Sequence, residues 1–242
     1  MASSDSDADA DDRRPHALDT YTRRGMTMMS GPKVCTHPIL LAIDQGTTST
    51  RVIKYELLGF HYKERDGERK DLRPIQSAQH PHKQIHPKPG WVEHDPEEII
   101  ENIKKCYREV GGAFTMAVGI TNQRETIVAW DSETMKPLHN AIVWCDARTA
   151  EIVSRFSEKE KHMVFQKTGI PISTYFSATK MRWLLENSKD VQKAAARGTL
   201  RFGTIDSWIV TKLGARRDSN NQELPNVHVT DVTNASRYLL MN

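Results

Sequence analysis

No apolar run in the sequence approaches the roughly 20 residues that a membrane-spanning helix requires. The chain also lacks a dominant charge: 34 basic and 31 acidic residues are mixed along it, and the net charge of +3 gives no indication of nucleic-acid binding. Its three cysteines, Cys35, Cys106 and Cys145, fit neither a disulfide framework nor a zinc site, which favours a reducing compartment. Without a membrane span or a targeting signal, a cytoplasmic protein is expected.

Residues 1–37 differ in composition from the rest. They begin with the acidic, low-complexity run MASSDSDADADD and contain no apolar segment typical of a signal peptide. This composition predicts a disordered tail. The remainder, residues 38–242, is long enough for one large domain or two small ones.

Strand and helix signals alternate beyond this tail, which predicts an α/β fold. The expected strands are Ile39–Asp44, Arg51–Leu57, Ala117–Thr121, Thr126–Asp131, Ala141–Trp144 and a segment near Val227–Asp231. One helix should begin after the capping residue Asp95, with Pro96 first and Glu98 completing a capping box, and should end at Gly111. Further helices are expected at Thr149–Phe156, Ser177–Asn187 and Asp206–Leu213.

Two segments between these elements have unusual compositions. Gly59–Pro74 is highly charged and is interpreted as a solvated hairpin extension or a surface insertion. His80–His94 contains four histidines, which allows a metal site, but prolines at positions 81, 87 and 89 favour an extended loop.

The stretch ILLAIDQGTTSTRVIKY (residues 39–55) has the pattern of two strands joined by a hydroxyl-rich turn. Gly46 lets the backbone approach a ligand closely, and the N–H groups and hydroxyls of Thr47, Thr48 and Ser49 can donate to phosphate oxygens. Asp44 precedes the turn and can hold Mg²⁺ through water. The turn is not a Walker A loop, because GxxxxGK[ST] is absent. The alternative is an ordinary hairpin with a polar turn.

A second polar cluster, Arg124 and Glu125, lies between two expected strands. A guanidinium donates hydrogen bonds and a carboxylate accepts them, so together they suit a small polyol. A surface ion pair is the alternative. Trp144 and Tyr175 can cover C–H surface with their rings, although core packing explains each of them equally well.

Together these segments resemble the FGGY carbohydrate kinase family, and within it the members that phosphorylate glycerol. The resemblance runs from Pro38 to Asn242 and rests on several segments in order: AIDQGTTSTR, KPGWVEHDP, ITNQRET, VWCDART, YFSATKMRWLLEN and HVTDVTNASR. It implies that residues 38–242 form the family's N-terminal domain, an RNase H-like domain with a mixed five-stranded sheet and flanking helices. It also implies ATP, Mg²⁺ and glycerol as ligands and glycerol 3-phosphate as product.

The resemblance further implies roles for individual residues at the nucleotide. Thr47, Thr48 and Ser49 would contact the phosphates, Arg51 would contact ADP, and Asp44 would help to place Mg²⁺.

At the polyol, Arg124, Glu125 and Tyr175 would hydrogen-bond glycerol, and Trp144 would pack against its carbon chain. Thr47 would also lie near the phosphate of the product.

Family members continue into a second domain that supplies the adenine pocket and an aspartate acting as general base, which is expected beyond Asn242. This expectation predicts that the 242-residue chain is weak or inactive alone. Two alternatives remain: another FGGY kinase that phosphorylates a pentulose, or a truncated, non-catalytic binding domain. The sequence leaves open whether the chain forms a homo-oligomer.

Overall fold

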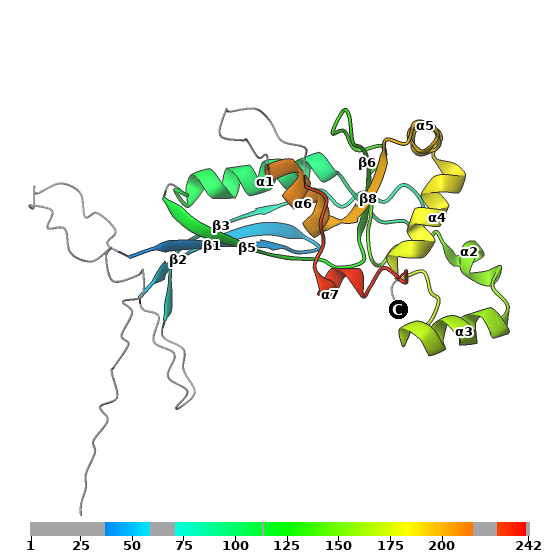
Figure 1. Ribbon diagram of the computed structural model, residues 1–242. Coiled ribbons are helices and arrows are strands. Elements are labelled where there is room, and N and C mark those ends of the chain that lie inside the picture. Colours follow the sequence, from blue (N-terminus) through cyan, green and yellow to red (C-terminus); the bar gives the residue numbers. More distant parts are fainter. Residues whose placement is uncertain (1–36, 59–70, 113, 215–226, 241–242) are drawn as a thin grey trace, which may run out of the picture. The chain divides into compact units, whose positions relative to one another are not determined.

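The computed structural model describes residues 37–58, 71–112, 114–214 and 227–240. Its first sheet has the strand order β3-β2-β1-β5 (Figure 1). The strands are β1 (Ile39–Gln45), β2 (Ser49–Leu57), β3 (Leu72–Pro81) and β5 (Thr115–Asn122). β1 pairs antiparallel with β2 and parallel with β5, so the sheet is mixed as expected. It has four strands, however, and the expectation of five was wrong.

A second sheet, with the order β4-β7-β6-β8, is antiparallel throughout. Its strands are β4 (Glu93–His94), β6 (Ile127–Asp131), β7 (Ala141–Ile142) and β8 (Leu200–Thr204). Between β5 and β6 the chain turns at Glu125, whose φ of 61° breaks the extended run. The strand expected at Thr126–Asp131 therefore belongs to this second sheet and does not extend the first.

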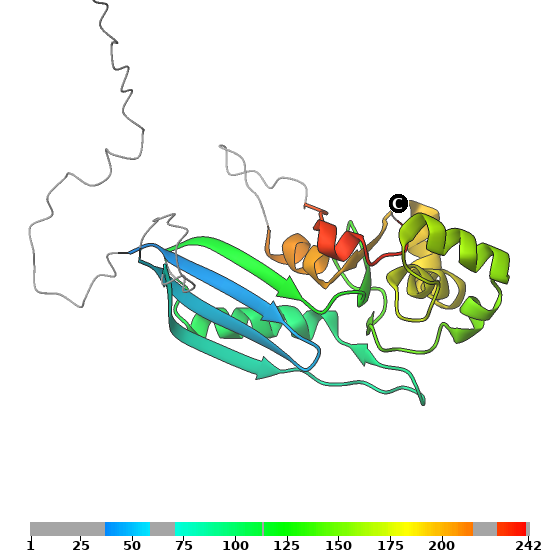
Figure 2. The same cartoon turned by 90° about the horizontal axis from the view of Figure 1, so that it is seen from below.

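Helix α1 (Pro96–Glu109) lies along one face of the first sheet (Figure 2). Asp95 caps it as expected, because its carboxylate accepts a hydrogen bond from Glu97 N at 2.8 Å. The expected capping box does not form, since the Glu98 carboxylate accepts from Lys83 N at 3.2 Å instead. Gly111, with a φ of 61°, follows the end of the helix. Apolar side chains of α1, β1, β2 and helix α6 (Ile205–Leu213) form the core between them.

The second sheet has its own core, against helices α4 (Ser177–Asn187) and α5 (Lys189–Arg197). Leu184 and Val191 are fully buried there against Ile127 and Ile142. Three further helices complete the described part: α2 (Ala150–Ser154), α3 (Glu158–Thr168) and α7 (Val232–Ala235).

The strand expected near Val227–Asp231 does not form. Its carbonyl groups are used by α6 instead: Ser207 Oγ donates to Val229 O at 2.7 Å, and Thr211 Oγ1 donates to Val227 O at 2.9 Å. The segment thus runs along a helix, where no neighbouring strand is available for pairing.

Other elements were missed because their burial pattern carries little signal. β3 is exposed along almost its whole length, and α3 buries no residue, so neither shows the periodicity of a half-buried strand or helix. Residues 1–36 and most of the charged segment Gly59–Pro74 lie outside the described residues. Within the described ranges, no helix combines the length and apolar composition needed to cross a membrane.

Candidate active site

The turn between β1 and β2 is the hydroxyl-rich segment that the sequence singled out. It is closed by Gly46 N, which donates to Ser49 O at 2.9 Å, and the strands that flank it pair from Gln45 opposite Thr50. The backbone N–H groups of Thr47 and Thr48 have no hydrogen-bond acceptor among the described residues. The turn therefore presents free donors at its surface, the arrangement that binds a phosphate.

Asp44 and Arg51 face each other across the two strands at this turn. Arg51 Nη2 donates to Asp44 Oδ2 at 2.7 Å, with side chains 45% and 37% exposed. Solvent weakens an ion pair that is this exposed. The exposure also leaves both side chains accessible to a ligand. Within the described ranges, no three His, Cys, Asp or Glu side chains gather as a metal cage. Asp44 suits Mg²⁺ nevertheless, since this ion is usually bound by one or two carboxylates, water and substrate phosphates.

Trp144 connects the turn between β1 and β2 (residues 46–49, called the phosphate turn below after its expected ligand) to the residues expected to bind a polyol. Its indole Nε1 donates to Thr47 Oγ1 at 2.9 Å, and its ring packs edge-on against Tyr175 with centroids 5.7 Å apart. The backbone N of Trp144 is fixed by Thr126 Oγ1 at 3.1 Å. The Thr47 hydroxyl, the Trp144 indole and the Tyr175 ring thus lie next to one another, although they come from three separate segments.

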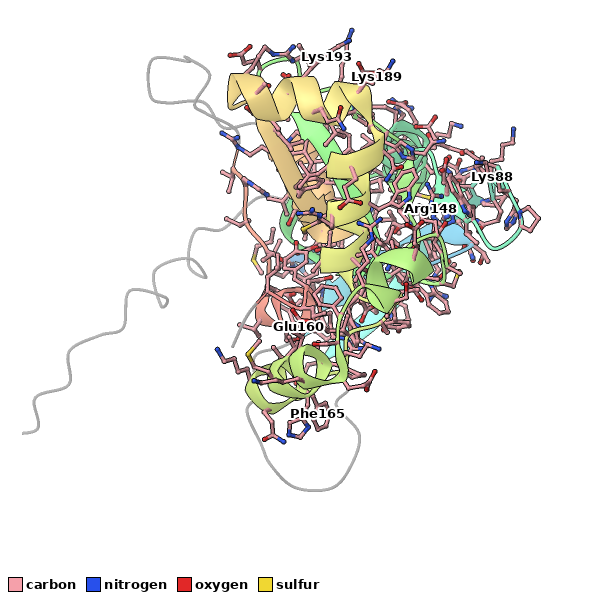
Figure 3. The ribbon with its side chains drawn as sticks, turned by 90° about the vertical axis from the view of Figure 1, so that its right-hand side faces the viewer. Lys88, Arg148, Glu160, Phe165, Lys189 and Lys193 are labelled. Carbon is pink, nitrogen blue, oxygen red and sulfur yellow. The ribbon has the colours of Figure 1, made fainter. Side chains whose placement is uncertain are left out.

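A buried cation fixes the segment that follows Trp144. Arg148 donates to both carboxylate oxygens of Asp146, forms an ion pair with Glu93, and lies with its guanidinium 3.9 Å from the ring centroid of Trp91. Figure 3 shows Arg148 among the side chains beside α4, whereas Lys189 and Lys193 point outward from α5. Because two carboxylates pair with its buried guanidinium, Arg148 can hold this loop in one conformation, although its Nη1 has no hydrogen-bond partner among the described residues.

Glu125 is 2% exposed and does not stand free. Its carboxylate accepts a hydrogen bond from Arg237 Nε, and this bond raises the pKa of Arg237. The guanidinium of Arg237 also lies over the rings of Phe176 and Tyr175, at 4.8 and 5.6 Å from their centroids. Arg237 was not singled out from the sequence, although it ends the segment HVTDVTNASR.

Lys180 lies beneath Tyr175 and is fully buried. Its ammonium group donates to the carbonyl oxygens of Thr174, at 2.9 Å, and of Tyr175. Burial lowers the pKa of Lys180 to about 8, while the nearby carboxylates of Asp146 and Glu125 oppose this shift. The lysine thereby ties the backbone of the Tyr175 segment to α4.

Arg124 occupies a different position from Glu125. It is exposed and lines a cavity of about 640 Å³ together with residues of β5, α6 and α7. Within the described part of the chain, no hydrogen bond, ion pair or ring contact joins Arg124 to Glu125, Trp144 or Tyr175. The structure therefore brings together Thr47, Trp144, Tyr175 and Glu125, and leaves Arg124 apart from them.

Residues 39–242 match the N-terminal domain of the FGGY family of carbohydrate kinases. The chain belongs to this family. This FGGY chain is 44% identical over 213 residues to a curated protein, the glycerol kinase of Paraburkholderia phytofirmans. The matched region covers 84% of this chain and 38% of that protein. The chain is also 44% identical over 216 residues to the glycerol kinase of Arabidopsis thaliana, covering 83% and 37%.

Solved structures of FGGY kinases share this fold. The structure of Plasmodium falciparum glycerol kinase with ADP superimposes with a TM-score of 0.68 at 37% identity, covering 85% of this chain and 38% of that one. A xylulose kinase from Lactobacillus acidophilus has a TM-score of 0.65 at 21% identity, a likeness of fold alone. The FGGY chain thus spans about two fifths of the length of the relatives that it matches.

The histidine-rich segment also contributes to this region, though not in the way considered from the sequence. His82 and His94 lie with ring centroids 4.4 Å apart behind the phosphate turn, and His82 Nε2 donates to Thr47 O at 2.8 Å. Burial lowers the pKa values of both histidines. The clustering of histidines in the sequence was the available signal, but it could not show that His82 hydrogen-bonds the turn.

Proposed function

We propose that this chain carries the glycerol-binding and phosphate-binding part of an ATP-dependent glycerol kinase, whose product is glycerol 3-phosphate. The observation that carries the proposal is the hydrogen bond from Trp144 to Thr47, which supports a polyol site next to the phosphate turn because Trp144 is the residue expected to pack against the polyol. The identity of 44% to glycerol kinases over most of the chain supports glycerol as the polyol.

In this proposal the polyol lies between Glu125, Tyr175 and Trp144. The buried carboxylate of Glu125 accepts from a glycerol hydroxyl while it keeps its bond to Arg237, since a carboxylate has several acceptor positions. Tyr175 offers a phenol and Trp144 an apolar ring face toward the C–H groups. Arg124 lines a cavity whose described lining residues do not include Glu125, Trp144 or Tyr175, so its part in binding the polyol stays a prediction.

The phosphate turn would bind the nucleotide. The free N–H groups of Thr47 and Thr48 and the hydroxyl of Ser49 donate to phosphate oxygens, and Arg51 adds a positive charge beside ADP. Asp44 is the expected partner of Mg²⁺, which neutralises phosphate charge when it is bound.

The reaction needs the glycerol hydroxyl to attack the γ-phosphorus, with ADP leaving and the hydroxyl proton passing to a base. The two described carboxylates next to the site, Asp44 and Glu125, each pair with an arginine and already have other roles in this proposal, toward Mg²⁺ and toward a glycerol hydroxyl. We therefore expect the base to lie outside the described residues. A missing general base costs about 10²- to 10⁴-fold, so we infer that the 242-residue chain alone transfers phosphate slowly or not at all.

The test is the melting temperature of the purified chain with glycerol, with xylulose and with ADP and Mg²⁺. At 100 times its Kd a ligand stabilises by about 2.7 kcal/mol, or roughly 5–10 °C for a domain of this size. Glycerol should give this shift and xylulose should not. Glu125→Gln should remove the response to glycerol, whereas the surface control Glu186→Gln should retain it.

The other outcomes identify the alternatives. A response to xylulose alone indicates a pentulose kinase, and no response to any ligand indicates a non-catalytic domain.

A further inference from the structure

Two consecutive carbonyl groups of the phosphate turn are held from behind by polar side chains. Thr47 O accepts from His82 Nε2 at 2.8 Å and from Gln84 Nε2 at 3.0 Å. Gly46 O accepts from Gln45 Nε2 at 2.8 Å and lies 3.2 Å from Gln123 Nε2, whose two N–H groups are shared among Gly46 O, Gln45 Oε1 at 3.1 Å and His94 Nδ1. Water could supply the hydrogen bonds that the carbonyl groups of an exposed turn need. The side-chain donors are therefore not needed merely to satisfy these carbonyl groups.

His94 connects the side chains that hold the turn. Its Nε2 lies 2.8 Å from Gln84 Oε1, and its Nδ1 lies 3.2 Å from Gln123 Nε2. Gln84 Oε1 can only accept and Gln123 Nε2 can only donate, so His94 is neutral with its proton on Nε2. Thr126 Oγ1 completes the network by donating to Gln123 Oε1 at 3.0 Å.

The network acts on the front of the turn through peptide geometry. All described peptide bonds are trans, and a trans peptide places its C=O and the next N–H on opposite sides. When Thr47 O is held inward, the N–H of Thr48 points outward. When Gly46 O is held inward, the same argument applies to the N–H of Thr47. These are the two N–H groups without an acceptor among the described residues.

We propose that His82, Gln84, His94 and Gln123 are positioning residues that orient the N–H groups of Thr47 and Thr48 toward the phosphate oxygens of a nucleoside polyphosphate. The proposal rests on the nucleotide-binding function proposed above and adds residues from the segment between β3 and α1 to it. The four side chains need not touch the nucleotide, since their effect passes through the peptide groups of the turn.

The network requires uncharged imidazoles. A proton on His94 Nδ1 would face the amide donor of Gln123, and a proton on His82 Nδ1 would be buried without an acceptor among the described residues. Burial, together with the neighbouring His82 and His86, lowers the pKa of His94 to about 3. Glu98 of α1 faces His82 and opposes the effect of burial there, without reversing it.

The substitution Gln84→Met tests the proposal, because it keeps the length of the side chain and removes the donor to Thr47 O and the acceptor for His94. Gln76→Met is the matched control: Gln76 Nε2 also donates to a backbone carbonyl, Glu109 O at 2.8 Å, but away from the turn. The first readout is the affinity for ADP with Mg²⁺, measured by calorimetry on the 242-residue chain. Gln84→Met should weaken it about ten-fold or more, as expected from one misaligned charge-assisted hydrogen bond, and Gln76→Met should not.

The second readout is the orientation of the Thr48 N–H, measured without nucleotide from residual dipolar couplings in NMR. Gln84→Met should change this coupling, whereas Gln76→Met should leave it as in the wild type. If Gln84→Met unfolds the chain, His82→Phe replaces it, with a smaller change expected because Gln84 still holds Thr47 O.

An unchanged coupling in the Gln84 variant overturns the proposal, and so does a changed coupling with unaltered affinity for ADP. If the wild type does not bind ADP at all, the nucleotide function fails and with it the purpose assigned to the network. The residual dipolar coupling of the Thr48 N–H still tests, independently of nucleotide binding, whether the network orients the turn.

Discussion

The ion pair between Arg237 and Glu125 gives the sharpest prediction about stability. We consider Arg237→Met, which preserves most of the side-chain length and its packing over Phe176 and Tyr175 but removes the charge. Glu125 is 2% exposed, and Arg237 is its ion-pair partner in the structure. The substitution therefore leaves a buried carboxylate without its cation.

The size of the effect follows from this burial. Removing one partner of a fully buried ion pair costs about 3–5 kcal/mol. The side chain of Arg237 is 28% exposed, so water partly compensates the loss, and we expect about 2–3 kcal/mol. For a domain of this size that corresponds to a decrease in melting temperature of roughly 4–12 °C.

Thermal and urea denaturation of the 242-residue chain, followed by tryptophan fluorescence, measure this loss. Arg182→Met is the matched control, because Arg182 is 67% exposed and its partner Glu186 keeps a second arginine, Arg155. Such a surface pair contributes at most about 0.5 kcal/mol. In a Glu125→Gln background, Arg237→Met should cost much less than in the wild type, because no buried charge is left behind.

Equal losses from Arg237→Met and Arg182→Met would refute this reasoning. A loss from Arg237→Met that is the same in the Glu125→Gln background would refute it as well, since the cost would then come from packing.

Three further predictions concern the site and its supports. Trp144→Phe keeps an aromatic ring beside Tyr175 but removes the donor to Thr47 Oγ1, so calorimetry should show weaker binding of both glycerol and ADP. Lys180→Met leaves the carbonyl groups of Thr174 and Tyr175 without their ammonium donor and should reduce the affinity for glycerol, measured by the same titration. For His94, whose pKa is about 3 in the folded chain against 6.5 as reference, the unfolded state binds more protons between these values. Stability should therefore fall as the pH decreases below about 6.5, by about 1.4 kcal/mol per pH unit from this group, and urea titrations should show a shallower dependence in His94→Gln.

The sequence was sufficient to predict the parts of the fold that have a local cause. The turn from Gln45 to Ser49 and helix α1 both formed where their residue patterns indicated, because a glycine, a capping aspartate and an apolar stripe act over a few neighbouring residues. The α/β class was predicted correctly from the alternation of strand and helix signals, which are also local. The family was predicted correctly because several short segments occur in the right order.

The rest depends on contacts between distant segments. The pairing of Glu125 with Arg237 spans 112 positions, and the hydrogen bond from His82 to Thr47 spans 35. Neither partner reveals the other in a single sequence, so Glu125 was expected to bind a polyol or pair at the surface, and the histidine segment was interpreted as an extended loop with a metal site as the alternative. The same limit explains why the strand expected near Val227–Asp231 is absent, because only the folded chain places Val227 along α6.

The most direct test of the central claim is the indole N–H resonance of Trp144 in NMR spectra of the 242-residue chain titrated with glycerol and, separately, with ADP and Mg²⁺. This proton lies between the polyol residues and the phosphate turn, as donor to Thr47 Oγ1 at 2.9 Å. The account predicts that both ligands shift this resonance, while the indole signal of Trp208, which donates to Pro96 O inside the core, does not move. A Trp144 signal that responds to neither ligand would contradict the account.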